Sequence, residues 1–541
     1  MKSRKIIFIL LTAFLFNFSV YSQKEEVKQL IKQRVASGIE SKSVAAAGIV
    51  LFSQNELPKF YTNQDFAPVW NDKKNVDDLL VSLKYSYLEG LIPNDYHLKK
   101  IEALQNKKLN SEEKADLDML MTDALLMYAS HLIIGKVDQS KIRPGWDMPL
   151  NKLPVNVDSL LTLSLKQNNI KEDLESLKPQ NFMYDYLKTG LEKYKGIARK
   201  GGWPEIQGGM VMKKGVAEDR VLTLRKYLSI TGDLDSYDET NNNFDDELEN
   251  AVKQFQFRHN MTQDGVVGKG TLEQMNITVE QRIDMIRINL ERARWVLHHL
   301  DSDFLVVNIA GFNIRRVTND EVVFFSRVIV GKLHHESPIF KARLTYFVLN
   351  PTWTVPYSIA TKETLPKLQK NPGYLADKNM EIMDRSGKVL DPSTIDFSQY
   401  SRNNFPFTVR QKAGPHNALG QVKFIFPNQY SVYVHDTPAR SLFGREDRAF
   451  SHGCIRLDKK WELLLNLTDD PDEWNMAKIN EVLKSGKTTN VNLKHPIDIV
   501  ILYWTAGADK QDKLYFDKDV YDRDPEVLKA LDAPVHFKAS K

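Results

Sequence analysis

The spacing of hydrophobic residues changes once along this chain, near residue 303. Before that point apolar residues recur about every three to four positions, the period of an amphipathic helix, as in the helix expected from Ser111 to Gly135. After it, short runs rich in β-branched and aromatic residues predict strands. These runs are 304–309, 312–317, 321–330, 344–349, 422–426, 430–434 and 499–504. The pattern predicts a multidomain α+β protein, helical toward its N-terminus and β-rich toward its C-terminus.

The chain is too long for one hydrophobic core, because 541 residues exceed the size at which single cores stop growing. Breaks in composition and period divide it into several parts. We expect a helical scaffold domain at 23–215, a three-helix module at 216–280, a linker helix at 281–302, a β-rich domain at 303–508 and a C-terminal extension at 509–541. Within the β-rich domain, helical and loop sequence at about 354–411, including a helix at 359–369, predicts an insertion placed to act as a lid.

Polar residues that suit helix N-termini indicate where several helices begin. Asn75 is expected to cap a helix over 76–88, and Asp245 begins a second helix in the three-helix module. Thr271 is expected to cap the short last helix of that module. The methionine and aromatic stripes of these helices are most simply core packing, so the N-terminal part is a scaffold without recognisable chemistry.

The N-terminus has the pattern of an export signal. Three basic residues precede the apolar run 6–20: Lys2, Arg4 and Lys5. We therefore expect a signal peptide at 1–22, cleaved after Ser22, and a protein of the periplasm or cell envelope. An uncleaved membrane anchor is the alternative, although about 15 apolar residues are few for a membrane span.

Cys454 is the only cysteine of the chain, so an exported protein of this sequence has no intrachain disulfide. It follows the small polar run Ser451-His452-Gly453 and precedes an apolar segment, which predicts a thiol on a tight turn. A nucleophilic thiol needs a partner that removes its proton. His435, 19 positions upstream at the end of an expected strand, and His452 are both able to do so.

The pattern His435, 15 intervening residues, then Ser451-His452-Gly453-Cys454 resembles the signature of the L,D-transpeptidase (YkuD-fold) catalytic domain. Four further segments occur in similar form in that family: Val330-Gly331-Lys332, Asn350-Pro351-Thr352-Trp353, Asn417-Ala418-Leu419-Gly420 and His435-Asp436-Thr437-Pro438. The segment 251–272 resembles the small three-helix peptidoglycan-binding domain. The order of the parts is similar to the long, periplasmic YcbB-type form, with scaffold, peptidoglycan-binding-like module and catalytic domain with a capping insertion.

The resemblance implies a peptidoglycan cross-linking enzyme that uses no cofactor. Such enzymes cleave the bond between diaminopimelate and D-Ala in a tetrapeptide donor stem and pass the acyl group to a diaminopimelate amine, forming 3→3 cross-links. Cys454 would be the nucleophile that carries the acyl group as a thioester, and His435 its base, oriented by the backbone carbonyl of Asp436. The N–H groups of Gly453 and Cys454 would hold the oxyanion. His452, with Ser451 beside it, would shape that pocket.

Six further side chains are candidates for substrate binding: Trp353, Tyr357, Tyr433, Arg445, Arg448 and Arg456. The two aromatic residues at the start of the insertion could line a donor groove, and the arginines before the turn could meet stem carboxylates. Arg456 stands where the wider family more often has Asn, so a role assigned to that Asn is not transferable. Arg456 could bind a substrate carboxylate or brace the turn, and a packing role is an equal alternative for the others.

Other readings of the same residues stay open. With water or a protein as acceptor, the enzyme would be an L,D-carboxypeptidase or a protein-to-wall attachment enzyme; a noncatalytic peptidoglycan-binding protein is a further alternative. His435, His452 and Cys454 are zinc-ligand types, but no His-Glu-x-x-His helix accompanies them, and His334-His335-Glu336 is expected at the surface, so no metal is expected. A net charge of +4 gives no support to nucleic acid as a partner. We expect a monomer. Its expected partners are peptidoglycan stem peptides, and other wall-synthesis proteins are further candidates.

Overall fold

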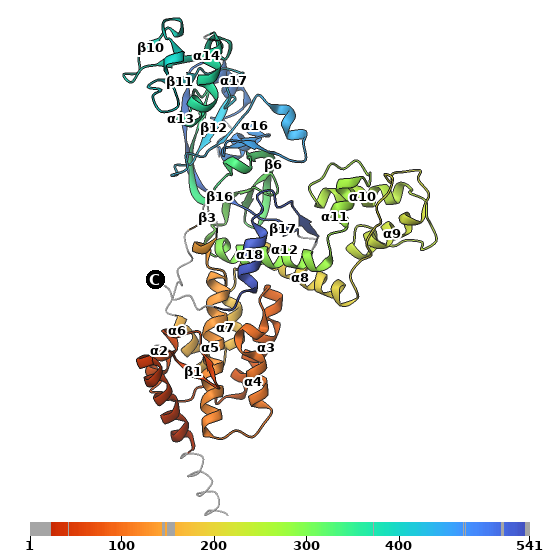
Figure 1. The fold of residues 1–541 in the computed structure, drawn as a ribbon, viewed down its shortest axis with the longest axis vertical. Coiled ribbons are helices and arrows are strands. Elements are labelled where there is room, and N and C mark those ends of the chain that lie inside the picture. The colour runs from red at the N-terminus through yellow and green to blue at the C-terminus, as the bar shows by residue number, and fades with distance from the viewer. Residues whose placement is uncertain are drawn as a thin grey trace, which may run out of the picture.

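The computed structural model describes residues 23–41, 43–142, 146–148, 157–371, 373–468, 470, 472–509 and 513–535, and the predicted signal peptide lies outside them. Figure 1 shows an elongated molecule with the helical scaffold at one end and the insertion at the other. The β-rich domain lies between them, and the three-helix module projects sideways as an arm. This multidomain α+β architecture confirms the fold class predicted from the hydrophobic pattern.

The scaffold is built around one long buried helix. Its elements are a helix over 23–41, β1 (Ala45–Ala46), β2 (Ile49–Val50), α2 (Glu56–Asn63), α3 (Lys73–Tyr85), α4 (Leu98–Gln105), α5 (Ser111–Ile134), α6 (Val157–Gln167), α7 (Ile170–Ser176) and α8 (Phe182–Arg199). Asn110 and Glu113 form a capping box at the start of α5, and Gly135 ends the helix with a φ of +78°, which favours glycine. Helix α5 is the one helix of the described ranges long and apolar enough to cross a membrane, but it is mostly buried within the scaffold.

Two of the predicted helix caps are wrong, because in each case the N-cap is a residue three positions earlier in the chain. Helix α3 begins after Asp72, whose side chain accepts a hydrogen bond from the Lys74 N–H, while Asn75 is buried and donates to the Leu165 carbonyl at 2.8 Å. In the module, α9 (Asp219–Thr231) and α10 (Asp246–Arg258) precede α11 (Lys269–Met275). Gly268 is the N-cap of α11, and Thr271 lies inside the helix.

Helix α12 (Val279–Val296) is a spine shared by scaffold and β-rich domain rather than a simple linker. The Arg294 guanidinium pairs with Glu291 at 2.6 Å and donates to the Glu89 carbonyl of the scaffold at 2.8 Å. Arg292 reaches Asp524 near the C-terminus at 2.6 Å. Helix α8 packs along α12, and its Tyr184 and Leu187 belong to the same hydrophobic core as the strands. The large parts of the molecule are therefore held together by buried contacts.

Eight strands of the β-rich domain close on themselves, because β12 pairs with both β13 and β7. In order around the ring they are β12 (Val422–Ile425), β13 (Val434–His435), β15 (Ile455–Leu457), β6 (Glu321–Gly331), β5 (Asn313–Thr318), β4 (Asp303–Asn308), β16 (Thr489–Leu502) and β7 (Ile339–Leu349). β14 (Ala449–Ser451) joins β6, and β3 (Trp146–Asp147) joins β7. Helices α16 (Lys460–Leu467) and α17 (Met476–Lys484) connect β15 to β16. The strand predicted at 430–434 is wrong for residues 430–433, which form a turn and loop. β16 begins ten residues before the predicted strand at 499–504 (499 − 489).

The insertion is a small subdomain with its own sheet, whereas the sequence predicted only helix and loop there. β8 (Trp353–Thr354), β9 (Met380–Met383), β10 (Val389–Leu390) and β11 (Thr408–Gln411) form the sheet in the order β10-β9-β11-β8. The predicted helix is present as α13 (Tyr357–Ile359), the π-helical turn η6 (Ala360–Thr364) and α14 (Leu365–Lys370), and α15 (Tyr374–Asp377) follows. These elements enclose a separate hydrophobic cluster, so the insertion is held together by its own core.

The segment predicted as a C-terminal extension packs into the rest of the fold. β17 (Ala506–Ala508) pairs with β18 (Leu514–Phe516), and the predicted boundary at residue 508 falls between these two strands. Leu514 and Phe516 lie in the core shared with α8 and α12, and α18 (Asp524–Asp532) packs against α12. We therefore treat residues 513–535 as part of the support of the β-rich domain.

Candidate active site

Cys454 and His435 come together because they lie on neighbouring parallel strands. β13 ends at His435, and β15 begins directly after Cys454; Val434 faces Ile455 and His435 faces Arg456 in the register of the pair. Gly453 has a φ of +112°, a backbone conformation that residues with a Cβ rarely adopt. The glycine therefore permits the sharp turn that presents the thiol.

The Cys454 thiol is half-buried and surrounded by groups from the turn before β13. Its Sγ lies 3.8 Å from the carbonyl oxygen of Ser431, to which the thiol can donate. Burial raises the pKa of the thiol, whereas hydrogen bonds from Tyr433 and the charge of Arg456 lower it. Because burial has the largest effect, the resting sulfur is a protonated thiol.

His435 is buried and held in the form of a neutral base. Its Nδ1 lies 2.5 Å from the backbone carbonyl of Asp436, the contact that the family resemblance implied. A proton on Nδ1 leaves Nε2 with a free lone pair. The pKa of His435 is lowered to about 3: burial lowers it most, the charges of Arg456 and Lys423 lower it as well, and the Asp436 and Leu419 carbonyls oppose them. The imidazole is therefore uncharged at neutral pH and able to accept a proton.

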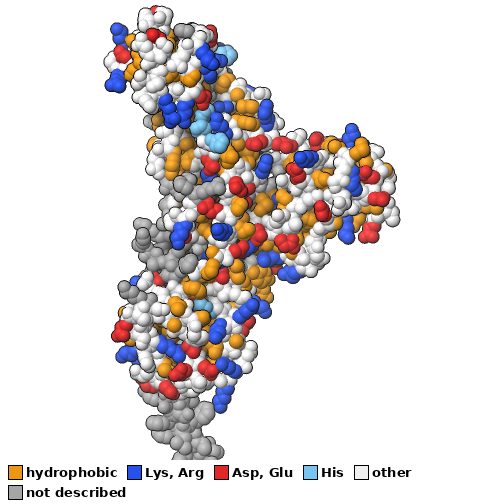
Figure 2. Space-filling model, viewed as in Figure 1, with side chains coloured by type: hydrophobic (Ala, Val, Ile, Leu, Met, Phe, Trp, Pro, Cys, Tyr) orange, Lys and Arg blue, Asp and Glu red, His pale blue; other side chains and the backbone are white. Residues whose placement is uncertain are grey.

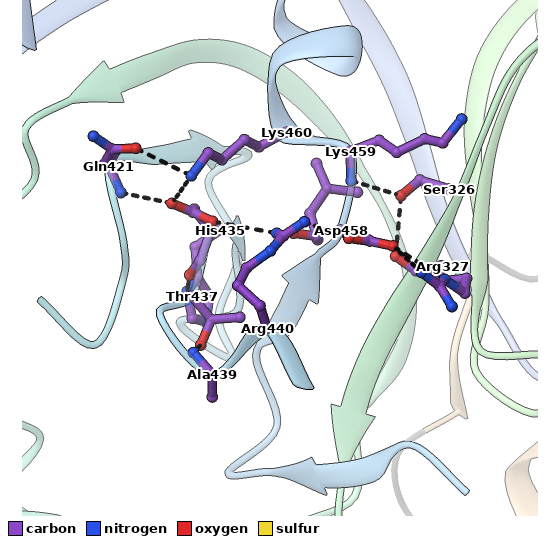
Figure 3. A network of polar contacts seen from close by, with 12 residues as sticks. Ser326, Arg327, Gln421, His435, Thr437, Ala439, Arg440, Asp458, Lys459 and Lys460 are labelled. Atoms are coloured by element: carbon purple, nitrogen blue, oxygen red, sulfur yellow. Dashed lines mark hydrogen bonds and ion pairs between the residues drawn. The ribbon is translucent and has the colours of Figure 1, made fainter. Parts of the chain in front are cut away.

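The carboxylate of Asp436 fixes the chain just after His435, and Figure 3 shows its partners Gln421, Lys460 and Arg440 around this point. It accepts hydrogen bonds from the Gln421 N–H at 2.9 Å and from the Lys460 ammonium, and Arg440 lies 3.7 Å away. A Cβ at Gly420 would lie 2.2 Å from this carboxylate, and Gly420 has a φ of +62°. The position therefore requires glycine, which accounts for the end of the 417–420 segment.

The backbone N–H groups near the sulfur differ in their availability. The Gly453 N–H donates to the Ser451 hydroxyl at 3.0 Å, and that hydroxyl donates to the Cys454 carbonyl at 2.5 Å. The Cys454 N–H has no hydrogen-bond partner among the described residues. In this conformation the Cys454 N–H, rather than that of Gly453, is the free donor of the turn.

A tyrosine from the C-terminal segment braces the turn, and sequence reasoning missed it. The Tyr521 hydroxyl donates to the Gly331 carbonyl and accepts from the Ser337 N–H at 3.2 Å. The Ser337 hydroxyl in turn donates to the Gly453 carbonyl at 2.7 Å. All four residues are buried. The segment around Gly331 is the one sequence signal of this network, and it gives no indication of Tyr521.

His452 points to the insertion rather than to the sulfur. Its Nε2 lies 2.7 Å from Glu363 Oε1, in the π-helical turn η6, and its ring lies 4.9 Å from the exposed ring of His335. The predicted surface segment 334–336 thus contacts the site, and its Glu336 pairs with Arg523. Single π-helical turns occur frequently at functional sites. The His452–Glu363 contact joins the insertion to the turn that carries Cys454.

Tyr433 and Arg456 are the two substrate-binding candidates that lie beside Cys454. The Tyr433 side chain is hydrogen-bonded with the thiol, and its pKa is raised, mostly by burial. Arg456 is close enough for its charge to act on both Cys454 and His435, and burial lowers its pKa. Its Nε is buried without a hydrogen-bond partner among the described residues. A buried donor of this kind is available to an anionic ligand.

The other four candidates lie elsewhere. Trp353 packs against the hydrophobic cluster of the insertion, and the exposed Tyr357 donates to the Arg402 carbonyl at 2.8 Å. Arg448 is buried and donates to the Arg445 carbonyl at 2.7 Å and to Asn260 of the module at 3.1 Å. Arg445 is exposed, 5.5 Å from the centre of the Phe450 ring. Arg448 thus connects two domains instead of facing the sulfur.

Alkylation of Cys454 by iodoacetamide is expected to accelerate with pH well into the alkaline range, because the thiolate is the reactive form and burial raises the pKa of this thiol above that of an ordinary cysteine. No inflection is expected between pH 5 and 8, since His435 stays neutral there. Intact-mass measurement follows the alkylation, and the Cys454→Ala variant shows how much of it occurs at amines. The denatured chain is the control and should reach its half-maximal rate at lower pH. A plateau below pH 7 in the folded protein would instead indicate a thiolate–imidazolium pair.

Models of known families match three separate parts of the chain. The model described as "L,D-transpeptidase catalytic domain" matches residues 302–486, the "Putative peptidoglycan binding domain" matches 217–275 and the "Scaffold domain" matches 55–191. Within the described ranges, no three His, Cys, Asp or Glu side chains are grouped so that they could hold a metal ion.

Individual relatives are similar over parts of the chain. A "Putative L,D-transpeptidase" of Haemophilus influenzae is 34% identical over 257 residues, which cover 48% of this chain and 50% of the relative. The chain thus matches about half the length of that relative. An L,D-transpeptidase structure from Stackebrandtia nassauensis is 11% identical to this chain, with a TM-score of 0.22. The match covers 55% of this chain and 96% of the Stackebrandtia chain. One from Mycobacterium smegmatis is 14% identical, with coverages of 37% and 58% and a TM-score of 0.18.

Proposed function

We propose, on the premise that residues 302–486 are an L,D-transpeptidase catalytic domain, that this protein forms 3→3 cross-links in peptidoglycan through a Cys454 thioester. The observation that carries the proposal is the placement of Cys454 and a neutral, buried His435 on adjacent parallel strands. The peptidoglycan-binding and scaffold domains at 217–275 and 55–191 agree with a polymeric wall substrate.

In the first step, His435 Nε2 accepts the thiol proton as Cys454 Sγ attacks the carbonyl carbon of the diaminopimelate–D-Ala bond. The oxyanion that forms is placed to accept from the Cys454 N–H; a contact of this kind lowers a barrier by about 3–4 kcal/mol. The Gly453 N–H could join it only after leaving Ser451. Collapse breaks the C–N bond, the imidazolium returns its proton to the departing D-Ala amine, and the acyl group remains as a thioester.

In the second step, a diaminopimelate amine of an acceptor stem attacks the thioester carbonyl. His435 accepts a proton from that amine, the C–S bond breaks, and the proton returns to the sulfur, so that the free thiol is regenerated. Water would hydrolyse the same thioester, so shielding matters for the outcome. The insertion, held to the turn by the contact between Glu363 and His452, is placed to provide that shield.

Arg456 is the side chain we propose to hold a substrate carboxylate next to the reacting carbonyl. Its unpartnered Nε and the effect of its charge on both Cys454 and His435 support this role. Tyr433 would contact the donor stem beside the sulfur. Trp353 and Tyr357 stabilise the insertion. They would contact a donor stem only if the stem extended from the sulfur along the insertion.

The peptidoglycan-acting domains indicate a location in the cell envelope. We propose that the basic and apolar segment at 1–22 directs export to the periplasm and is removed after Ser22. We further propose that the enzyme acts as a monomer. Stem peptides of the wall are its donor and acceptor, and other wall-synthesis proteins are candidate partners.

Mass spectrometry of wild-type protein incubated with a disaccharide-tetrapeptide tests the function. We expect a cross-linked dimer that has lost one D-Ala, together with a transient protein adduct of the mass of the acyl group. A reaction without protein controls for spontaneous change. Loss of D-Ala without dimer would replace the proposal with a carboxypeptidase. Unchanged substrate, despite binding of the protein to wall sacculi, would favour a noncatalytic binding protein.

A further inference from the structure

A cleft of about 890 Å³ lies where the module, the β-rich domain and helix α8 meet. Its walls include Tyr186 of α8, Phe257 of α10, Arg315 of β5, Phe325 of β6, the loop residue Arg445, and Tyr515 of β18. We call it the interdomain cleft. Figure 2 shows hydrophobic side chains interspersed with charged ones near the junction of the lateral arm with the body.

The walls of the interdomain cleft are fixed against each other by direct hydrogen bonds. Asn260 of the module donates to the Gly311 carbonyl at 3.1 Å and accepts from Arg448 at 3.1 Å. The Thr262 N–H donates to the Glu446 carboxylate at 2.7 Å. These contacts join the module to two loops of the β-rich domain. The cleft is therefore preformed, which lowers the entropic cost of binding a ligand.

Aromatic rings are exposed inside the cleft. Phe257 is 55% exposed and Phe325 48% exposed, and Phe257 meets Tyr515 edge to face with ring centres 5.8 Å apart. Exposed aromatic side chains that line a concave surface are typical of ligand-binding sites. Their flat apolar faces suit the flat apolar faces of sugar rings.

Two arginines present open hydrogen-bond donors beside these rings. Arg315 lies over Phe325 with its guanidinium 5.7 Å from the ring centre, and Arg445 lies over Phe450 at 5.5 Å. Neither guanidinium has a hydrogen-bond partner among the described residues, although Asp517 is near enough to act on Arg315. Guanidinium groups held in this way donate to carboxylate and amide oxygens. The cleft thus combines apolar platforms with donors for acidic or amide groups.

We propose that the interdomain cleft binds the glycan strand of peptidoglycan, with N-acetylated sugar rings on Phe257, Phe325 and Tyr515. Arg315 and Arg445 donate to acetamido or carboxyl oxygens of the strand. This inference rests on the proposed function and deepens it, since it names the polymer side of the substrate. A glycan is favoured over a protein partner because one wall belongs to the peptidoglycan-binding domain. The opposite wall also leads directly to the catalytic turn.

The position of Arg445 connects the cleft to the chemistry. Arg445 precedes Ser451 by six residues in the chain (451 − 445), and the intervening β14 runs beside β6, the strand that carries Phe325. The cleft and the turn of Cys454 are therefore joined by one short segment of the chain, and we expect the stem peptides of a bound strand to extend along it. Binding of the glycan would deliver stems to the thiol without adding any catalytic group.

Binding of stem-free glycan strands, prepared by amidase digestion of sacculi, tests the proposal by calorimetry on the full chain. Phe257→Ala and Phe325→Ala should each weaken binding about tenfold, the effect of truncating a central aromatic contact. Met210→Ala is the matched control, because Met210 is 87% exposed and lies outside the cleft lining. Its affinity should equal that of wild type. Equal affinity of all variants, or no binding of the strands to wild type, would overturn the proposal.

A second readout separates the cleft from the chemistry. Turnover is compared between a sugar-free tetrapeptide donor and glycan strands that carry stems. The two aromatic variants should lower the ratio of strand to peptide turnover about tenfold, whereas a folding defect would lower both rates together. If wild type turns over neither donor, the proposed function fails, while binding of stem-free strands would still support the cleft. An unchanged ratio would contradict the inference.

Discussion

Replacing Cys454 with alanine is expected to abolish the acyl-enzyme and to lower cross-link formation by about a million-fold, the loss typical of removing a catalytic nucleophile. No other thiol is present to replace it. The Ser451 hydroxyl is engaged with the Cys454 carbonyl and the Gly453 N–H, so it is not expected to replace the thiol. Intact-mass spectra after incubation with a disaccharide-tetrapeptide should show an adduct on wild type and none on the variant.

Cys454→Ser is the matched control for this experiment, because it keeps the side-chain size and a hydrogen-bond donor toward the Ser431 carbonyl. The hydroxyl is a far weaker nucleophile beside a neutral imidazole, so serine should restore little of the rate. Both variants should unfold at nearly the wild-type temperature, since the thiol is half-buried and its contacts with Tyr433 and, at 3.8 Å, with the Ser431 carbonyl are the weak hydrogen bonds of a sulfur. An adduct on Cys454→Ala would place the nucleophile elsewhere.

The sequence predicted what depends on local pattern. The change of hydrophobic period located the β-rich domain, whose β4 begins at Asp303. The spacing between His435 and Cys454 identified two residues that the fold places on adjacent strands. The location of the β-rich domain could be predicted because hydrophobic periodicity acts over a few neighbouring positions. The pairing of His435 with Cys454 came from the chemistry of a thiol nucleophile and from the family resemblance, which also implied the carbonyl of Asp436 as the partner of His435.

The contacts that complete the site join residues far apart in the chain, and no local pattern encodes them. Tyr521 reaches Gly331 across 190 positions, and Glu363 reaches His452 across 89. The sheet of the insertion was missed because its strands are only two to four residues long, too short for an alternating pattern. The wrong caps at Asn75 and Thr271 have a different cause, competition between nearby residues for the N-cap position. A suitable residue type caps only where no neighbour takes the position first.

The Gly453 N–H illustrates a different limit. The sequence identified the turn, and family resemblance implied that both the Gly453 and Cys454 N–H groups bind the oxyanion. The availability of the Gly453 N–H depends on the Ser451 hydroxyl, which accepts from this N–H and donates to the Cys454 carbonyl. Side-chain hydrogen bonds of this kind compete for backbone donors without any sequence signal.

Replacing His435 with glutamine is expected to slow formation of the acyl-enzyme about a thousandfold, within the usual range for loss of a general base. The glutamine amide can still donate toward the Asp436 carbonyl at the site of the present 2.5 Å contact, but it has no basic nitrogen. His452→Gln is the matched control and should slow the reaction less than tenfold, because His452 points to Glu363. Quenched reactions read by intact mass give both rates. A larger loss for His452→Gln than for His435→Gln would assign the base to His452, and it would mean that the insertion, through Glu363, takes part in the proton transfer.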